Sequence, residues 1–345
     1  MGVADFTSAL YLGMRHPSAA LGNWEALTLG RPAALQEAPG AVRLAQALAR
    51  LQGCEAATLL PSTLHLFWDL FGMLASERVA LLIDSGAYPI ARWGAERGRA
   101  LGLPLQVFPR GAVAVAAQLA RRAQEGGRRP VILADGYCPG SASAPPLAAY
   151  ARIAAAGDGL LVLDDTQVLG LFGPGGGGSL AWHGLKGSHV VVGASLAKGF
   201  GAPLAVLAGG ADLVRRFDAC SQTRIHASPP SVAAIHAASR ALRLNRDCGD
   251  ALRRKLWQRV AQLQAGLGNI SMVSGGGRFP VQTLRLAAGV DGQALHSGLA
   301  RHGVDTVLQM AGKHPVISFL LRADHSRSDI ERALAALEHQ LLEAV

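Results

Sequence analysis

One lysine lies among small residues in GASLAKGFG, residues 193–201, directly after the apolar run HVVVG. A lysine amine attacks carbonyl groups only after it has lost its proton, and burial or a nearby cation lowers its pKa enough for that. Lys198 is therefore a candidate for Schiff-base chemistry. A surface lysine and a phosphate-binding loop are the alternatives, but the glycines do not follow the GxxxxGK[ST] spacing of such a loop.

A pair of aspartates, Asp164 and Asp165, ends a second apolar run, GLLVLDD. Asp164 precedes Lys198 by 34 residues (198 − 164 = 34). A carboxylate at such a strand end can keep the nitrogen of a bound pyridine ring protonated, and the ring then accepts electrons. A role in a turn or a helix cap is the structural alternative. A strand-ending aspartate followed by a strand-ending lysine is the arrangement with which fold-type I pyridoxal-phosphate (PLP) enzymes hold their cofactor.

Short apolar runs alternate with amphipathic segments between residues 41 and 195. We expect strands at 79–84, 103–108, 130–136, 159–165 and 189–195, and helices at 41–53, 64–75, 113–125 and 146–156, with one more helix between the first two strands. This alternation predicts a mostly parallel sheet with helices on both faces, in which ligands gather at the carboxyl ends of the strands. Lys198 and Asp164 both follow such ends.

The pattern changes after about residue 236. A long helix over 231–267, strands near 279–286 and 316–322 and a last helix over 329–344 predict a smaller α+β domain. We therefore expect an N-terminal segment at 1–40, a large domain at 41–235 and a small C-terminal domain at 236–345. The 345 residues are enough for both domains.

Composition excludes several classes of protein. The net charge of +9 comes from arginines scattered in pairs, which suits anionic small molecules better than nucleic acid. The cysteines lie far apart without ligand spacing, so we expect reduced thiols and no metal site; they are Cys54, Cys138, Cys220 and Cys248. No apolar run approaches the roughly 20 residues needed to cross a bilayer, and the N-terminus lacks the pattern of a signal peptide. These features predict a cytoplasmic protein that acts neither on nucleic acid nor in a membrane.

The segment GPGGGG, residues 173–178, matches the dinucleotide-binding pattern GxGxxG literally. That motif joins a strand directly to a helix and is followed by an acidic residue about 20 positions later. Here SLAWHG and then another strand follow. We therefore reject the dinucleotide interpretation and expect a loop over the entrance of the site.

Two longer segments resemble those of a known family. LLVLDDTQVLGLFGPGGGGS is similar to the VDEAHSxGVLGxxGRG segment of the α-oxoamine synthases, and ASLAKGFGAPLAVLAGG is similar to their TFGKGFG segment. Further similar segments follow in the same order along nearly the whole chain, at residues 6–17, 83–90, 132–154, 224–234 and 325–337. The resemblance implies a fold-type I PLP-dependent transferase, whose large domain has a mostly parallel seven-stranded sheet.

The resemblance also implies a role for individual residues. Lys198 would form a Schiff base with PLP, and Asp164 would pair with the ring nitrogen. Tyr88 stands where the family has the histidine that stacks on the ring, and Gln167 where it has the histidine that binds the phenolic oxygen. The phosphate would be bound by Ser62, Thr63 and Ser195, with Ser228 of the partner subunit. Helix-cap, turn and core positions are the structural alternatives for these residues.

Three departures from the family pattern concern the substrate. An amide such as Gln167 cannot change its protonation near neutral pH as imidazole does. Ala9, with Leu10 beside it, replaces an asparagine, and Val316 or Ser318 stands at the arginine that takes the amino acid's carboxylate in the family. Arg322 lies one short strand beyond and would need a different register to serve. Because a buried carboxylate without a charged partner is costly, either another arginine serves or the substrate differs.

The sequence thus predicts a homodimeric, PLP-dependent acyltransferase. It would join an amino-acid-derived carbanion to an acyl thioester, carried by coenzyme A or by an acyl-carrier protein, with Lys198 displaced by the substrate amine and then carrying the proton. One alternative keeps the cofactor and changes the reaction to aminotransfer, decarboxylation or a lyase step on an atypical amine. The other is a degenerate, non-catalytic family member.

Overall fold

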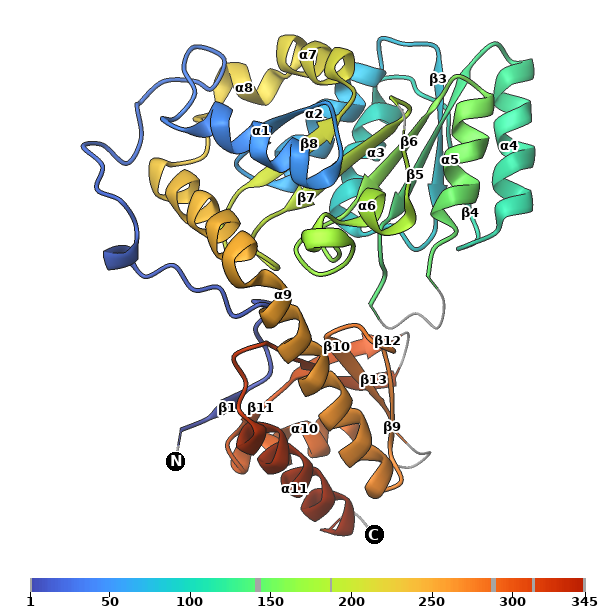
Figure 1. The fold of residues 1–345 in the computed structure, drawn as a ribbon. Coiled ribbons are helices and arrows are strands. Elements are labelled where there is room, and N and C mark those ends of the chain that lie inside the picture. The colour runs from blue at the N-terminus through green and yellow to red at the C-terminus, as the bar shows by residue number, and fades with distance from the viewer. Residues whose placement is uncertain (1, 140–143, 187, 287–289, 312–313, 344–345) are drawn as a thin grey trace. The chain divides into compact units, whose positions relative to one another are not determined.

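The computed structural model describes residues 2–139, 144–186, 188–286, 290–311 and 314–343 (Figure 1). Contacts divide the chain into two compact units. Unit 1 comprises Met1–Met14, Pro139–Ser143 and Cys248–Val345, and unit 2 comprises Arg15–Cys138 and Ala144–Asp247. The helix α9 (Val232–Asn269) runs across the division. The domain boundaries that we expect from the sequence stay a prediction.

Unit 2 contains a seven-stranded sheet. In spatial order its strands are β2 (Ala56–Leu60), β8 (Ala205–Gly209), β7 (Val190–Ser195), β6 (Leu160–Asp164), β5 (Arg129–Asp135), β3 (Val79–Asp84) and β4 (Leu105–Phe108). The last five of these are mutually parallel, whereas β8 runs antiparallel to both of its neighbours. The predicted mostly parallel, seven-stranded sheet is confirmed. Because β8 is antiparallel to both β2 and β7, these two strands point the same way.

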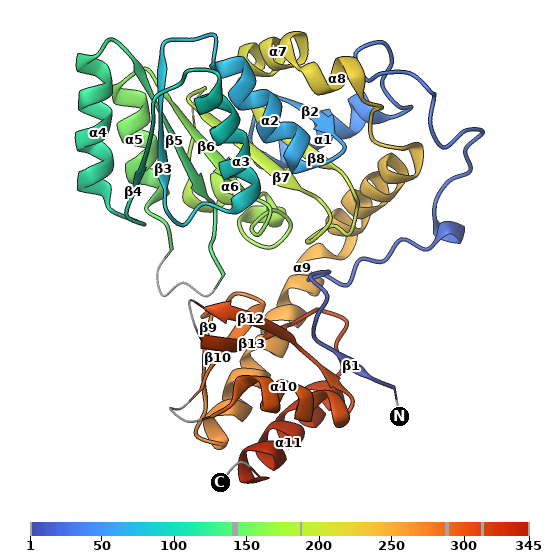
Figure 2. The same cartoon turned by 180° about the vertical axis from the view of Figure 1, so that it is seen from behind.

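Helices cover both faces of this sheet, which is why its central strands β3, β6 and β7 are mostly apolar and buried. One buried cluster joins the strands to α2 (Thr63–Leu74), α3 (Pro89–Ala100) and α7 (Ala211–Cys220) (Figure 2). The other joins them to α4 (Val113–Glu125), α5 (Leu147–Ala156) and α6 (Ser179–His183). Val162 belongs to the first cluster and Leu163 to the second. Because successive side chains alternate, Asp164 continues the face of Val162, toward α2 and α3.

Glycines allow α2 to pack unusually close to its neighbours. A Cβ at Gly94 of α3 would lie 2.6 Å from the backbone carbonyl of Phe67, and one at Gly193 of β7 would lie 2.9 Å from a methyl of Leu66. Both distances are shorter than carbon contacts allow. The position of the N-terminus of α2 therefore depends on these two glycines. Two more helices complete this unit, α1 (Ala41–Gln52) and α8 (Gln222–His226).

Unit 1 contains a four-stranded antiparallel sheet and a parallel pair of short strands. The sheet has the order β12 (Val307–Ala311), β13 (His314–Leu320), β10 (Val281–Arg285) and β9 (Val273–Gly275). The pair consists of β1 (Ala4–Asp5) and β11 (Val304–Asp305), and the helices are α10 (Gly292–Arg301), α11 (Arg327–Glu343) and the end of α9. The predicted smaller C-terminal α+β part is confirmed. In the described part of the chain, no helix combines the length and apolar character required to cross a bilayer.

Candidate active site at the carboxyl edge of the sheet

The parallel strands bring polar residues together at one edge of the sheet in unit 2. Asp135 at the end of β5 pairs in register with Asp164 at the end of β6, and Asp164 pairs with Gly193 of β7. Lys198 follows the end of β7 by three residues (198 − 195 = 3). Since β2 points the same way as β7, Ser62 after β2 lies at the same edge. This edge therefore gathers most of the predicted site residues.

Lys198 and Asp164 lie close enough for their charges to interact. Burial lowers the pKa of the Lys198 amine, and the carboxylates of Asp164 and Asp135 offset this only in part. Burial likewise raises the pKa of Asp164, against hydrogen bonds from Thr166 and the charge of Lys198. The Asp164 side chain is almost completely buried, with 6% of the residue exposed. The two residues that the sequence singles out thus meet in one partly desolvated site.

Thr166 links these two residues through the backbone. Its N–H donates to Asp164 Oδ1 over 3.0 Å, and its Oγ1 accepts from the Ser195 N–H over 3.0 Å. The Ser195 hydroxyl accepts in turn from the Ala197 N–H over 3.2 Å. The turn that carries Lys198 is therefore tied to the carboxylate of Asp164. Because the Ser195 hydroxyl only accepts here, its proton stays able to donate.

Tyr88 is at the N-cap position of α3, and 53% of the residue is exposed. The alternative of a core ring is therefore wrong. The Lys198 Nζ lies 6.0 Å from the centre of its ring, at the outer limit of a cation–π contact. The aromatic ring thus lies near the amine, and its stacking on a cofactor stays a prediction.

Ser62 occupies the N-cap of α2 without capping it. Its hydroxyl bonds to His65 Nδ1 over 2.9 Å, and no N-cap hydrogen bond from its side chain is present. Thr63 is the first residue of the helix and is half-buried. Among the described residues, the first backbone N–H groups of α2 have no recorded partner, which leaves them for an anion. Ser228 is exposed beyond α8, and no contact within the described chain brings it to this group.

Gln167 and Asp165 occupy the turn after β6. Gln167 is half-buried there, whereas Asp165 is 1% exposed and accepts hydrogen bonds from the N–H and hydroxyl of Ser179. Burial raises the pKa of Asp165 to about 6. Cβ atoms at Gly136 and Gly178 would lie 2.1 and 2.2 Å from its carboxylate oxygens, so Asp165 is enclosed and holds α6. The segment at 173–178 begins nine residues after β6 (173 − 164 = 9) and forms no direct strand-to-helix junction.

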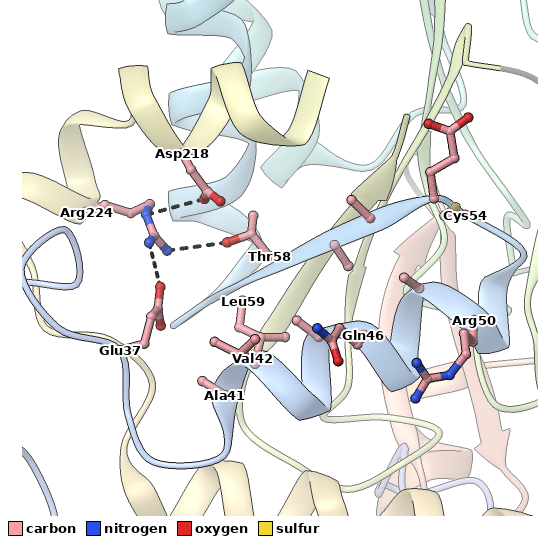
Figure 3. Close-up of a pocket in the computed structure, with 15 residues that line it drawn as sticks. Glu37, Ala41, Val42, Gln46, Arg50, Cys54, Thr58, Leu59, Asp218 and Arg224 are labelled. Atoms are coloured by element: carbon pink, nitrogen blue, oxygen red, sulfur yellow. Dashed lines mark hydrogen bonds and ion pairs between the residues drawn. The ribbon is translucent and has the colours of Figure 1, made fainter. Parts of the chain in front are cut away.

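A groove of about 480 Å³ lies elsewhere, between α1 and β2 (Figure 3). Arg224 bridges Glu37, Thr58 and Asp218 at one end of it, over 2.5, 3.4 and 3.4 Å. None of the predicted site residues lines the groove. The network fixes the N-terminal segment against β2 and α8, and we assign it a structural role.

Comparisons with known proteins agree with this geometry. No family model matches the chain. It is 29% identical over 238 residues to the 8-amino-7-oxononanoate synthase of Thioalkalivibrio sulfidiphilus, covering 67% of this chain and 59% of that protein. It is 32% identical over 198 residues to the enzyme of the same name from Delftia acidovorans, covering 52% and 47%. The chain thus spans less than two thirds of the length of these relatives. The chain is related to the α-oxoamine synthases.

Solved structures show the same fold. The serine palmitoyltransferase of Sphingomonas wittichii matches 98% of this chain and 87% of its own, with a TM-score of 0.87 and 17% identity. A variant of the S. paucimobilis enzyme with a bound PLP–myriocin aldimine matches equally well, with a TM-score of 0.87 and 15% identity. The 8-amino-7-oxononanoate synthase of Francisella tularensis matches 99% of this chain and 98% of its own, with a TM-score of 0.76 and 16% identity. The fold is that of fold-type I PLP-dependent transferases.

This relative of the α-oxoamine synthases has a second carboxyl group at Lys198, which the sequence analysis did not single out. Asp135 is 8% exposed, and burial together with Asp164 raises its pKa to about 8. The nearby Cys138 thiol lies 2.9 Å from the Gly86 carbonyl oxygen, and burial raises its pKa to about 12. The signal for Asp135 was available, because ILAD ends an apolar run as LVLD does.

Unit 1 holds no arginine at the position where α-oxoamine synthases are expected to bind a carboxylate. Ser318 of β13 is buried, and its hydroxyl bonds to Thr283 Oγ1 over 2.8 Å. Arg322 bonds instead to the carboxylates of Asp5 and Asp324, over 3.1 and 2.9 Å. Ala9 and Leu10 are half-buried in the same unit. Arg322 therefore holds the N-terminal strand rather than standing free for a ligand.

Proposed function

We propose that this chain binds PLP and catalyses the condensation of an amino-acid-derived carbanion with an acyl thioester, delivered by coenzyme A or by an acyl-carrier protein. One observation carries the proposal: an amine and a buried carboxylate, far apart in sequence, meet beside an aromatic ring at the carboxyl edge of a fold-type I sheet. The names of the relatives and the PLP bound to a structural neighbour support it.

The residues at this edge fit PLP group by group. The buried carboxylate of Asp164 suits a protonated ring nitrogen, because an ion pair compensates for the burial of either charge. The amine of Lys198 suits the aldehyde, and its lowered pKa increases the fraction that is unprotonated. The uncapped N-terminus of α2 at Ser62 and Thr63 suits the phosphate. Tyr88 supplies an aromatic face.

Bound PLP would supply an electron sink for negative charge at the substrate carbon. The protein's own residues do the rest. Lys198 Nζ, whose pKa is lowered by burial, can take up a proton from the substrate carbon that carries the amine and return it. Thr166 keeps the Asp164 carboxylate in place through its N–H. The amide of Gln167 can donate a hydrogen bond, but it cannot gain or lose a proton near neutral pH.

We propose further that the working form is a homodimer in which Ser228 of the partner subunit completes the phosphate site. Two observations support this: Ser228 is exposed and, among the described residues, forms no hydrogen bond with Ser62 or Ser195, and α2 and α3 expose large rings. Trp68 is 42% and Trp93 52% exposed. Large apolar rings exposed on neighbouring helices are typical of a surface that another protein chain covers. Light scattering at several protein concentrations would measure the mass. A cytoplasmic location stays a prediction.

A second candidate function is aminotransfer, decarboxylation or a lyase step on an amine without the usual carboxylate. The absence of an arginine at Val316 or Ser318, with Arg322 paired, favours it. Incubation with candidate amines, with and without an acyl thioester, separates the candidates. Thioester-dependent release of free thiol and a new ketone support condensation; products that form without thioester support the second candidate. A non-catalytic family member would give neither.

Borohydride trapping tests PLP binding directly. The purified protein is incubated with PLP, its visible absorbance is recorded, borohydride is added, and the modified peptide is identified by mass spectrometry. We expect loss of the visible band and one adduct at Lys198. The Lys198→Ala variant should lose both signals, whereas Lys186→Ala, which alters an exposed lysine, should keep them. An adduct that persists in Lys198→Ala would contradict the assignment.

A further inference from the structure

Asp135 lies at the proposed site but has no part in the function proposed above. Its Cα pairs with that of Asp164 across neighbouring strands, and β5 presents it on the same face of the sheet. The residue is 8% exposed. Burial of a carboxyl group costs free energy unless hydrogen bonds compensate for the lost water.

Those partners belong to the segment that carries Tyr88. The Tyr88 N–H donates to Asp135 Oδ1 over 3.0 Å. The Cys138 thiol lies 3.6 Å from Asp135 Oδ2 and 2.9 Å from the Gly86 carbonyl oxygen. Asp135 and Cys138 thus attach the segment 86–88 to the end of β5, at two points. Because Pro89 follows Tyr88 and fixes the start of α3, this attachment also fixes where the ring lies.

The surroundings of Asp135 differ from those of Asp164. Burial and the charges of Asp164 and Asp84 raise the pKa of Asp135, whereas hydrogen bonds from the Tyr88 N–H and the Cys138 thiol lower it. The charge of Lys198 lowers the pKa of Asp164, the neighbour that is tied to Thr166. Lys198 interacts with both carboxyl groups, so their hydrogen bonds distinguish them: Asp164 accepts from the Thr166 N–H, whereas Asp135 accepts from the Tyr88 N–H.

Resting on the proposed function, we propose that Asp135 is a positioning residue: it holds the Tyr88 ring beside Lys198, and so against the face of the cofactor, through the Tyr88 N–H. Its contribution to cofactor binding passes through the ring of Tyr88.

Hydrogen exchange of the cofactor-free protein tests the anchor without any assumption about function. Pro89 has no amide hydrogen, so a peptide that starts at Gly86 and ends at Pro89 reports mainly on Ala87 and Tyr88. Exchange should be about tenfold faster in Asp135→Ala than in the wild type, and close to wild type in Asp135→Asn, whose carbonyl still accepts. Asp158→Asn, at an exposed turn, is the matched control. Equal exchange in Asp135→Ala and the wild type would overturn the proposal.

A double-mutant cycle then tests the path through the ring. The dissociation constant of PLP is measured for Asp135→Ala, Tyr88→Ala and the double variant. We expect Asp135→Ala to weaken binding about tenfold in the wild-type background and less than about twofold in the Tyr88→Ala background. Equal weakening in both backgrounds would overturn the proposal. If Asp135→Ala does not fold, Asp135→Leu keeps the branched shape without an acceptor. Should the wild type not bind PLP, the proposed function fails while the exchange result still decides the anchor.

Discussion

Replacing Gly94 by alanine should separate two helices that position the candidate site. The new Cβ would lie 2.6 Å from the carbonyl carbon and oxygen of Phe67 and 2.7 Å from its Cβ. An ordinary contact needs about 3.4 Å, so α3 and α2 must move apart by about 0.8 Å. Gly94 is buried and the obstacle is backbone, so no side-chain rotation relieves the clash.

The size of the effect follows from two opposing contributions. Overpacking of a rigid interface costs about 1–3 kcal/mol. Alanine in a helix gains about 1 kcal/mol over glycine. The difference is about 0–2 kcal/mol, and because the obstacle is backbone we expect the free energy of unfolding to fall by the upper part of that range, about 1–2 kcal/mol. Because α3 begins at Tyr88 and α2 at Ser62, the same movement should also weaken PLP binding.

Urea unfolding followed by tryptophan fluorescence suits the measurement, since Trp68 and Trp93 lie on these two helices. Gly268→Ala is the matched control, because no atom lies within 4 Å of a Cβ at that helical position. It should leave the unfolding midpoint unchanged or raise it slightly. A Gly94→Ala variant as stable as the wild type would refute the close packing of α2 on α3.

Three further predictions concern the carboxyl edge. Asp164→Asn should weaken PLP binding at least about tenfold, measured by equilibrium dialysis, because a charge-assisted hydrogen bond becomes a neutral one; unchanged affinity would contradict the pairing. Gly136→Ala should lower the melting temperature measurably, because its Cβ would lie 2.1 Å from Asp165 Oδ1. Folded-state pKa values of about 8 for Asp135 and about 6 for Asp165 exceed the ordinary 3.8, so stability is lost as the pH rises from about 4 to about 6 through Asp165 and from about 4 to about 8 through Asp135. The loss between pH 5 and pH 9 in urea unfolding should be smaller in Asp135→Asn than in the wild type, and an equal loss would refute the raised pKa.

The sequence predicts the fold best where helices bury strands on both sides. Five strands of unit 2, β3 to β7, alternate with amphipathic segments and were predicted from that alternation. β2 and β8 were not, because AATLL and AVLAG lie among segments without clear periodicity. Only the family resemblance implied a sheet of seven. β1, two residues long, pairs with β11 about 300 positions later, which no local pattern encodes.

The site divides in the same way. Lys198 and Asp164 could be predicted because strand ends mark the ligand edge of a parallel sheet. The end of ILAD marks Asp135 as a further strand-end carboxylate, but its bond to the Tyr88 N–H could not be predicted, because it depends on how the segment before α3 folds against the end of β5, which is a tertiary property. The sequence also suggested Ser62 as an ordinary helix cap. Its hydroxyl bonds to His65 instead, and a competition between two local partners cannot be read from residue types.

The contacts of Arg322 bear on whether this chain can bind a substrate carboxylate as the resemblance to the family implies. The Arg322 side chain is 7% exposed, and its guanidinium pairs with Asp5 and Asp324 and also donates to the Asp5 carbonyl oxygen. Turning it toward a substrate would break two ion pairs, with carboxylates that are 42% and 35% exposed, and the bond to the Asp5 carbonyl oxygen, so one new contact would replace three existing ones. Arg322 therefore stabilises the N-terminal strand, and Ser318 offers only a hydroxyl. A substrate whose carboxylate must be held at this position is thus disfavoured, which makes amines without that group the first compounds to test.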